Sequence, residues 1–225
     1  TEGNAWHYLW SVFQDPQGLI NLMGGNDNFI SKLDEVFTSP NTVHVGTYGG
    51  KIHEMTEMQM ANMGQYAHGN QPIQHMIYLY NYAKQPWKAQ YHARNVMDKL
   101  YDYTENGYPG DEDQGQTSSW YVLSALGFYS VCPGTNQYVL GSPVFKKTTI
   151  TLENGNKFVI NAPKNDKAHV YIEAASLNGQ NYTKNFITYD DILTGGTFDL
   201  KMSTSPNKER GTGERDKPFS LSAKK

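Results

Sequence analysis

The chain has 225 residues, 19 basic and 22 acidic side chains, a formal net charge of −3 and a pI near 6.1. This mildly acidic balance offers no basic surface for a nucleic acid backbone, and no apolar run approaches the roughly 20 residues that span a membrane. The length suffices for one domain and a small second one, and the single cysteine, Cys132, excludes an internal disulfide.

The first ten residues are dense in apolar rings and lack a polar lead-in. We therefore expect the chain to continue from a larger protein rather than to start at a natural N-terminus. Sixteen Tyr, nine Phe and four Trp make the whole chain rich in aromatic side chains. Such rings suit sugar binding because pyranose faces stack on them, and a Tyr-rich core explains the same composition equally well.

The first 130 residues have the spacing of helices. Asp15 as N-cap and Pro16 as first helical residue predict a short helix over 16–23, which Gly24 ends. The apolar spacing predicts further helices over 27–37 (capped by Asn26), 54–65, 72–83 and 86–103, joined by a loop over 38–51 and a tight turn over 66–72. The 38–51 loop could line a cleft.

After Pro133 the pattern changes to β-branched and aromatic runs. Strands are predicted at 148–152, 157–160, 169–172 and 197–200, with turns at 153–156 and 178–179. Helices followed by strands suggest two packed modules. The tail from Ser205 is polar and charged, so we expect it to be poorly ordered.

Three consecutive carboxylates stand in residues 109–115, here called the acid loop, ahead of an apolar helix predicted from Trp120 to Phe128. Adjacent carboxylates repel one another, so such a cluster is either fully solvated or functional. Asp111 and Asp113 stand where a helix N-terminus favours negative charge, which makes them a candidate active-site floor. The alternative is that Asp113 caps the helix in a solvated loop.

Two metal motifs are incomplete. The zinc-protease helix that begins at His53 has Glu57 where its second histidine belongs, and the calcium loop of the EF-hand type fails at Gln116 and Val122. What remains is carboxylate chemistry on three segments, from Glu2, Glu54, Glu57, Asp111 and Asp113. Glycoside hydrolysis needs two carboxyl groups on opposite sides of a sugar, and such oxygen donors also suit calcium.

Seven ordered motifs together resemble the α-mannosidases of glycoside hydrolase family 92 over about residues 1–205. They read TEGNAWHY (1–8), HEMTEM (53–58), GQYAHGNQP (64–72), YLYNYA with QPW (78–83 and 85–87), PGDEDQGQTSSWY (109–121), ALGFY (125–129) and GSPVF (141–145). The resemblance implies the second half of an (α/α)6 toroid in residues 1–132, a small β-rich, sandwich-like module over 133–205 and a polar tail over 206–225. It also implies a partner, the N-terminal half of the same protein.

The resemblance implies a calcium-dependent exo-α-mannosidase that inverts the anomeric centre. Glu2 matches the general acid of the family, and Asp113 matches its general base, with Asp111 as assistant. Because a general acid must keep its proton near neutral pH, we expect Glu2 in an apolar, ring-lined setting of the kind that Trp6 and Tyr8 could supply. Asp113 must stay ionised, which a helix N-terminus favours.

The same resemblance assigns the remaining site residues. Glu57 is the expected ligand of Ca2+, and Asn70 is a second candidate for the metal or the sugar. His53 and Glu54 resemble the pair that members selective for α-1,2-linked mannose place against the sugar beyond the scissile bond. The implied substrates are mannose-containing glycans, including N-glycans, and the implied setting is secreted, periplasmic or on the cell surface.

Two alternatives remain open. The chain could be a non-catalytic carbohydrate-binding or scaffold module that kept the fold, although the presence of Glu2, Asp111 and Asp113 together argues against decay. It could also be another inverting (α/α)6 enzyme, such as a glucoamylase-like hydrolase or a disaccharide phosphorylase. Phosphorolysis needs a basic anion pocket, and the acid loop offers none.

Overall fold

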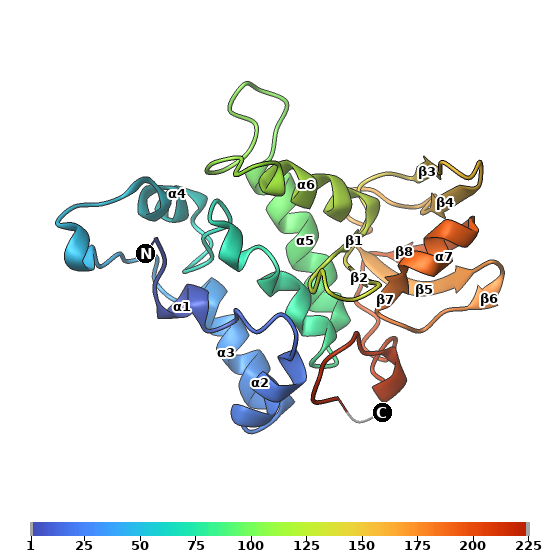
Figure 1. Ribbon diagram of the computed structural model, residues 1–225, viewed down its shortest axis with the longest axis horizontal. Coiled ribbons are helices and arrows are strands. Elements are labelled where there is room, and N and C mark those ends of the chain that lie inside the picture. The colour runs from blue at the N-terminus through green and yellow to red at the C-terminus, as the bar shows by residue number, and fades with distance from the viewer. Residues whose placement is uncertain (1, 224–225) are drawn as a thin grey trace.

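The computed structural model describes residues 2–223, in which a helical part is followed by a β-rich part (Figure 1). The helices of the first part are α1 (Ala5–Tyr8), α2 (Pro16–Leu22), α3 (Asn26–Thr38), α4 (His53–Ala61), α5 (Pro86–Leu100) and α6 (Gln116–Leu126). This order confirms the predicted succession of helices and strands. No helix within the described residues is long and apolar enough to cross a membrane.

The first two long helices follow local sequence signals. The Asp15 carboxylate accepts a hydrogen bond from Gly18 N at 3.0 Å, and Pro16 is the first residue of α2, as predicted. Helix α3 begins one residue earlier than expected, because Gly25, with φ +116°, is its N-cap and Asn26 is already helical. Its buried apolar side chains are Phe29, Ile30, Leu33 and Val36.

The prediction of a one-sided helix over 72–83 was wrong. The segment forms two 3-10 helices, η2 (Gln71–Ile73) and η3 (Met76–Asn81), and every residue of η3 is buried. Asn81 lies inside and donates to Tyr78 O and Leu140 O, both at 3.0 Å. A segment buried on all sides has no polar face, so its sequence carries no period that reveals the type of helix.

The β-rich part contains two sheets. β1 (Phe128–Tyr129), β2 (Gln137–Leu140) and β7 (Phe186–Thr188) form an antiparallel sheet in that order. The second sheet has the order β3 (Lys147–Thr151), β4 (Lys157–Asn161), β8 (Gly196–Ser203), β5 (Tyr171–Leu177) and β6 (Gln180–Asn181), with β4 and β8 parallel. The four predicted strands are present, and β5 and β6 form the hairpin predicted at 178–179. Strands β1, β2 and β7 and the short helix α7 (Tyr189–Thr194) were missed, because elements of so few residues show no period.

Two hydrophobic cores meet at α5. One core packs the helical segments around large rings such as Trp10, Tyr78 and Trp120, and the other lies under the five-stranded sheet. The buried Arg94 of α5 joins them, since its guanidinium donates to Pro143 O at 2.9 Å and to Asn165 Oδ1 at 2.6 Å. Buried charged hydrogen bonds of this kind fix the two parts against each other.

The tail, expected to be poorly ordered, packs onto both parts. The Arg210 side chain is buried and donates to Lys184 O at 3.1 Å, while Asn185 Nδ2 donates to Gly211 O at 2.7 Å. Further on, Ser220 Oγ donates to Asp15 Oδ1 at 2.6 Å, at the start of α2. The prediction failed because polar composition was taken as solvation, whereas these polar groups satisfy buried backbone and capping partners.

Candidate active site

One loop, residues 64–74, contacts every segment that carries a candidate catalytic side chain, and we call it the central loop. Asn70 Nδ2 donates to Glu2 O at 3.3 Å, and the neighbouring Gln71 Nε2 donates to Asp111 O at 3.1 Å. Two consecutive side-chain amides thus hold the backbones of the expected general acid and of the acid loop. Both bonds go to backbone carbonyls, so neither carboxylate is consumed by them.

Close backbone contact joins the central loop to the acid loop. A Cβ built on Gly110, whose φ is +71°, would lie 2.3 Å from Gly69 O, and one built on Gly69 would lie 2.7 Å from Glu57 Oε2. Real Cβ atoms essentially never come that close to backbone, so Gly110 requires glycine, whereas a Cβ at Gly69 would displace the Glu57 carboxylate and lie 3.0 Å from Gly110 Cα. The two glycines therefore bring α4, the central loop and the acid loop within contact of one another.

The N-terminal segment is held by the other end of the central loop. Asn4 caps α1 through Trp6 N and also donates from Nδ2 to Gln65 Oε1 at 3.0 Å. The buried His7 lies 3.0 Å through Nε2 from Gln65 O, and burial lowers its pKa. Sequence reasoning gave His7 no role; its spacing of three residues from Asn4, typical of a capping box, was the available signal.

A buried histidine binds the central loop to α6. His68 Nδ1 lies 2.7 Å from Tyr66 Oη, and His68 Nε2 lies 2.8 Å from Tyr101 Oη. Tyr101 Oη donates onward to Thr117 O, so it accepts from His68 Nε2–H, and burial lowers the pKa of this neutral imidazole to about 3. The imidazole also meets the Trp120 ring edge-on at 4.2 Å, which fixes its orientation.

The acid loop has an unusual backbone. Asp113, Gln114 and Gly115 have φ values of +48°, +58° and +91°, so helix α6 begins only at Gln116. The alternative that Asp113 caps the helix is wrong, because the carboxylate of Glu112 accepts from Ser118 N at 3.2 Å and from Ser118 Oγ at 2.8 Å. Left-handed non-glycine residues cost free energy and concentrate at functional sites.

The carboxylates of the two candidate base residues, Asp111 and Asp113, do not cap helix α6. The side chains of Asp111 and Asp113 are exposed, and no hydrogen bond to the Asp113 carboxylate occurs within residues 2–223. Two residues separate Asp113 from the first helical residue, Gln116, so its negative charge lies near the N-terminal end of α6 without capping it.

The start of α4 forms an ionic cluster beside the acid loop. His53 Nδ1 lies 3.1 Å from Glu57 Oε1, and His53 Nε2 lies 3.1 Å from Glu54 Oε1 and 3.9 Å from Asp111 Oδ2. The hydrogen bond to Glu57 is the main cause that raises the pKa of His53. The structure thus brings together four residues singled out from separate motifs.

In each glutamate of this cluster one carboxylate oxygen pairs with His53 and the other has no partner in residues 2–223. Oε2 of Glu54 and Oε2 of Glu57 are buried and have no hydrogen-bond partner within the described chain. A buried carboxylate oxygen without a partner is costly unless a donor or a cation satisfies it, and calcium prefers such oxygens. No group of three or more His, Cys, Asp or Glu in residues 2–223 is arranged to hold a metal ion, so carbonyl, amide or water oxygens would have to complete a calcium site.

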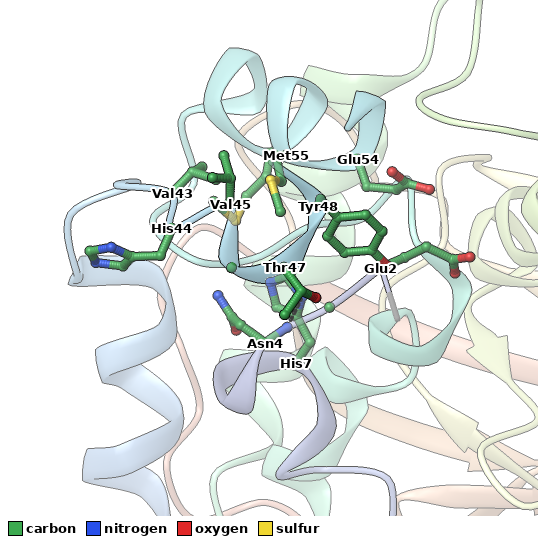
Figure 2. A pocket seen from close by; sticks show the side chains of 13 residues that line it. Glu2, Asn4, His7, Val43, His44, Val45, Thr47, Tyr48, Glu54 and Met55 are labelled. Atoms are coloured by element: carbon green, nitrogen blue, oxygen red, sulfur yellow. Dashed lines mark hydrogen bonds between the residues drawn. The ribbon is translucent and has the colours of Figure 1, made fainter. Parts of the chain in front are cut away.

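A pocket of about 210 Å³ opens between the N-terminal segment, the 43–48 loop and α4 (Figure 2). Figure 2 shows the carboxylates of Glu2 and Glu54 on the same side of this pocket, with the ring of Tyr48 beside Glu2. The expectation that the 38–51 loop lines a cleft is confirmed. This volume lies below the ~300–1,000 Å³ typical of small-molecule sites.

The surroundings of Glu2 differ from those expected. Glu2 is exposed, and neither Trp6 nor Tyr8 lines its pocket. Lys32 Nζ lies over the Trp6 ring at 4.0 Å from its centroid, and Tyr8 lines a different pocket behind the central loop. The ring beside Glu2 comes instead from Tyr48, a residue that no sequence motif singled out because its loop has no regular pattern.

The profile of the glycosyl hydrolase family 92 catalytic domain matches residues 1–204. A curated relative, an uncharacterized secreted glycosidase of Arthroderma benhamiae, is 30% identical over 99% of this chain and 26% of its own length. Among solved structures, an inverting mannosidase of family GH92 from Bacteroides thetaiotaomicron is 57% identical, with a TM-score of 0.85 over 98% of this chain and 30% of that chain.

A second solved structure, a family GH92 α-mannosidase of the same bacterium, is 36% identical with a TM-score of 0.87 over 99% of this chain and 28% of that chain. It has also been solved in complex with mannoimidazole. The chain therefore spans about a quarter to a third of the length of these relatives. The resemblance inferred from the seven motifs is confirmed.

The contact between the two glycines predicts a specific sensitivity. Gly110→Ala places a Cβ against Gly69 O, so we expect it to lower the free energy of unfolding by about 2–3 kcal/mol, from backbone strain and steric overlap. Gly49→Ala is the matched control, since Gly49 has the same φ of +71° and open space around its Cβ position. Urea unfolding of both variants measures the difference, and equal losses would show that no close contact exists at Gly110.

Proposed function

Because this chain belongs to glycosyl hydrolase family 92, we propose that it forms the acid- and base-bearing C-terminal portion of an exo-α-mannosidase. The observation that supports this most directly is the pair of bonds from Asn70 to Glu2 O and from Gln71 to Asp111 O. They bring the two segments expected to carry the general acid and the general base to adjacent residues of one loop. A non-catalytic module has no need for that juxtaposition.

The proposed reaction is hydrolysis with inversion. Glu2 gives its proton to the glycosidic oxygen as the bond from that oxygen to the anomeric carbon breaks. Asp113, assisted by Asp111, takes a proton from the water that attacks the opposite face of the sugar. One proton leaves Glu2 and one arrives on Asp113, so the exchange balances. Such a pair must stand about 6.5–9.5 Å apart to leave room for the water.

Calcium is part of the proposal, and the donor chemistry of α4 fits it. Glu57 would hold the ion, with Asn70 as a second oxygen donor on the adjacent central loop. The unpartnered, buried Oε2 of Glu57 supports this, since a hard cation would satisfy it. When bound, the ion would act as a template and Lewis acid for the sugar hydroxyls.

A preference for α-1,2-linked mannose is proposed from His53 and Glu54. The two side chains form an ion pair at 3.1 Å beside Asp111, at the edge of the acid loop, where a sugar beyond the scissile bond would lie. Both His53 nitrogens face carboxylates, and Oε2 of Glu54, unpartnered within the described residues, is the acceptor that would receive a sugar hydroxyl. Mannose-containing glycans, including N-glycans, are the proposed substrates.

The proposed architecture follows the family. We assign residues 1–132 to the second half of an (α/α)6 toroid, 133–205 to a sandwich-like module and 206–225 to a tail that ties the two together. The two hydrophobic cores support a division near this point, with Phe128 in the second core and Val139 in the first. The complementary N-terminal half would complete the site, so turnover is expected in the protein extended by that half and not in these 225 residues alone. A secreted, periplasmic or cell-surface setting is proposed by analogy with the secreted relative.

The catalytic assignment predicts that variants of Glu2 and Asp113 respond differently to a change of leaving group. In the extended protein, Asp113→Asn should abolish turnover of both α-1,2-mannobiose and α-mannosyl fluoride while sugar binding persists, because both substrates need an activated water. Glu2→Gln should lose activity on mannobiose but keep it on the fluoride, whose leaving group needs no proton. Steady-state kinetics and calorimetric binding check this, and turnover of mannobiose by Asp113→Asn would refute the role of the base.

The calcium assignment predicts a loss of metal binding that does not depend on catalysis. In the extended protein Glu57→Gln should bind calcium at least tenfold more weakly than the wild type, since a charged oxygen ligand becomes neutral. Glu35→Gln, on the exposed face of α3, is the control and should leave calcium affinity unchanged. Isothermal titration with calcium alone gives the affinities, and equal values for wild type and Glu57→Gln would exclude this ligand.

The linkage assignment is tested with the three mannobioses. The extended protein should hydrolyse the α-1,2 isomer faster than the α-1,3 and α-1,6 isomers. In Glu54→Gln that preference should shrink by at least tenfold in kcat/KM, because a charged hydrogen-bond acceptor is lost from the site. The readout is kcat/KM for each isomer, and a wild-type preference for the α-1,3 isomer would contradict the assignment.

A further inference from the structure

Gln71 has no role in the proposed chemistry, yet it occupies the junction between the central loop and the acid loop. Its Nε2 donates to Asp111 O at 3.1 Å and lies 3.3 Å from Thr117 Oγ1. The Thr117 hydroxyl itself donates to Asp111 O at 2.9 Å. One carbonyl, that of Asp111, therefore accepts hydrogen bonds both from the central loop and from the first turn of α6.

The position of the Asp111 carbonyl affects the backbone that carries Asp113. It stands two residues before Asp113, and the intervening Glu112 is held by Ser118 on α6. The residues that follow, 113–115, all have positive φ and would relax if the loop were released. Two backbone bonds from α6, Gln116 N to Asp113 O and Thr117 N to Glu112 O, hold the C-terminal side of this loop, and the bonds to the Asp111 carbonyl hold its N-terminal side.

Gln71 is itself held rigidly enough to act in this way. It begins η2, Pro72 follows it inside that turn, and Gln74 N donates back to Gln71 O at 3.1 Å. Buried Gln74 also reaches Thr117 Oγ1 at 3.4 Å, and Trp120 Nε1 donates to Gln74 O at 3.0 Å. The amide of Gln71 therefore projects from a braced turn rather than from a flexible loop.

We infer that Gln71 is a positioning residue for the general base: through the Asp111 carbonyl it sets where the carboxylate of Asp113 meets the attacking water. This inference rests on the proposed function. Asn70, the residue before it, makes the corresponding bond on the acid side, to Glu2 O. Asn70 thus contacts the segment of the general acid, and Gln71 contacts the segment of the general base.

The test uses Gln71→Met in the extended protein, since methionine keeps the length and volume of glutamine without its donor. We expect kcat to fall by about 10²-fold, the effect of a misplacement near 1 Å, with KM changed by less than about twofold. The fall should be equal for α-mannosyl fluoride and α-1,2-mannobiose, because the defect lies on the water side. Gln137→Met is the matched control: it removes a glutamine whose Oε1 accepts from Phe219 N at 2.8 Å, far from the site.

A second variant and a second readout guard against misfolding. Thr117→Val removes the other donor to the Asp111 carbonyl and should give the same kinetic pattern. Amide hydrogen exchange of residues 112–117 in both variants should accelerate about tenfold, the loss of one net hydrogen bond, and should not change in Gln137→Met. Exchange reports the loop even if the wild-type protein releases no mannose, in which case the proposed function fails separately.

Several outcomes would overturn the inference. Unchanged kcat with a lower melting temperature would make Gln71 a structural residue only. A rise in KM at constant kcat would place it on the substrate. A loss confined to mannobiose would assign it to the acid side, and unchanged exchange in residues 112–117 would show that it does not hold the loop.

Discussion

The close approach of Gly69 to Gly110 is the contact on which the rest of this structure depends. It joins backbone to backbone, so a residue with a side chain at Gly110 would push the two loops apart. Because the two loops are this close, the side-chain amide of Asn70 reaches Glu2 O and that of Gln71 reaches Asp111 O. The Glu57 side chain of α4 lies against Gly69. The central loop therefore acts as a fixed frame, and the catalytic candidates are attached to it by backbone rather than by side chain.

Because backbone groups hold the loops together, the acidic side chains are not needed for that purpose. A carboxylate that caps a helix or forms an ion pair is stabilised in its charged form and is less available for proton transfer. Here Glu112 caps α6, and the bonds from the central loop go to backbone carbonyls. Within residues 2–223 the carboxylates of Asp113 and Glu2 therefore accept no hydrogen bond, whereas Asp111 Oδ2 lies 3.9 Å from His53 Nε2 in the ionic cluster. The buried histidine His68, neutral between two tyrosines, adds rigidity without adding charge.

Sequence predicted most where local rules decide the outcome. Helix α2 followed from Asp15 and Pro16, and the hairpin at Asn178 followed from a residue pair that accepts positive φ. Sequence failed at η3, because burial on all sides hid its type of helix. It also placed the start of the next helix at Trp120, whereas α6 begins at Gln116, because its polar first turn shows no apolar spacing. For the site, motifs found the acids on α4 and in the acid loop, but not Tyr48 or Gln71, whose importance comes only from what lies beside them.

In the proposed site the central loop holds Glu2 and Asp113 across a gap wide enough for one water. The most direct test is the anomeric configuration of the first sugar released from an α-mannoside, followed by proton NMR before mutarotation, in the protein extended by its N-terminal half. We expect β-mannose to appear first, because water attacks the face opposite the departing group. Initial release of α-mannose would contradict it, since retention needs two carboxyl groups only about 5–5.5 Å apart and leaves no place for that water.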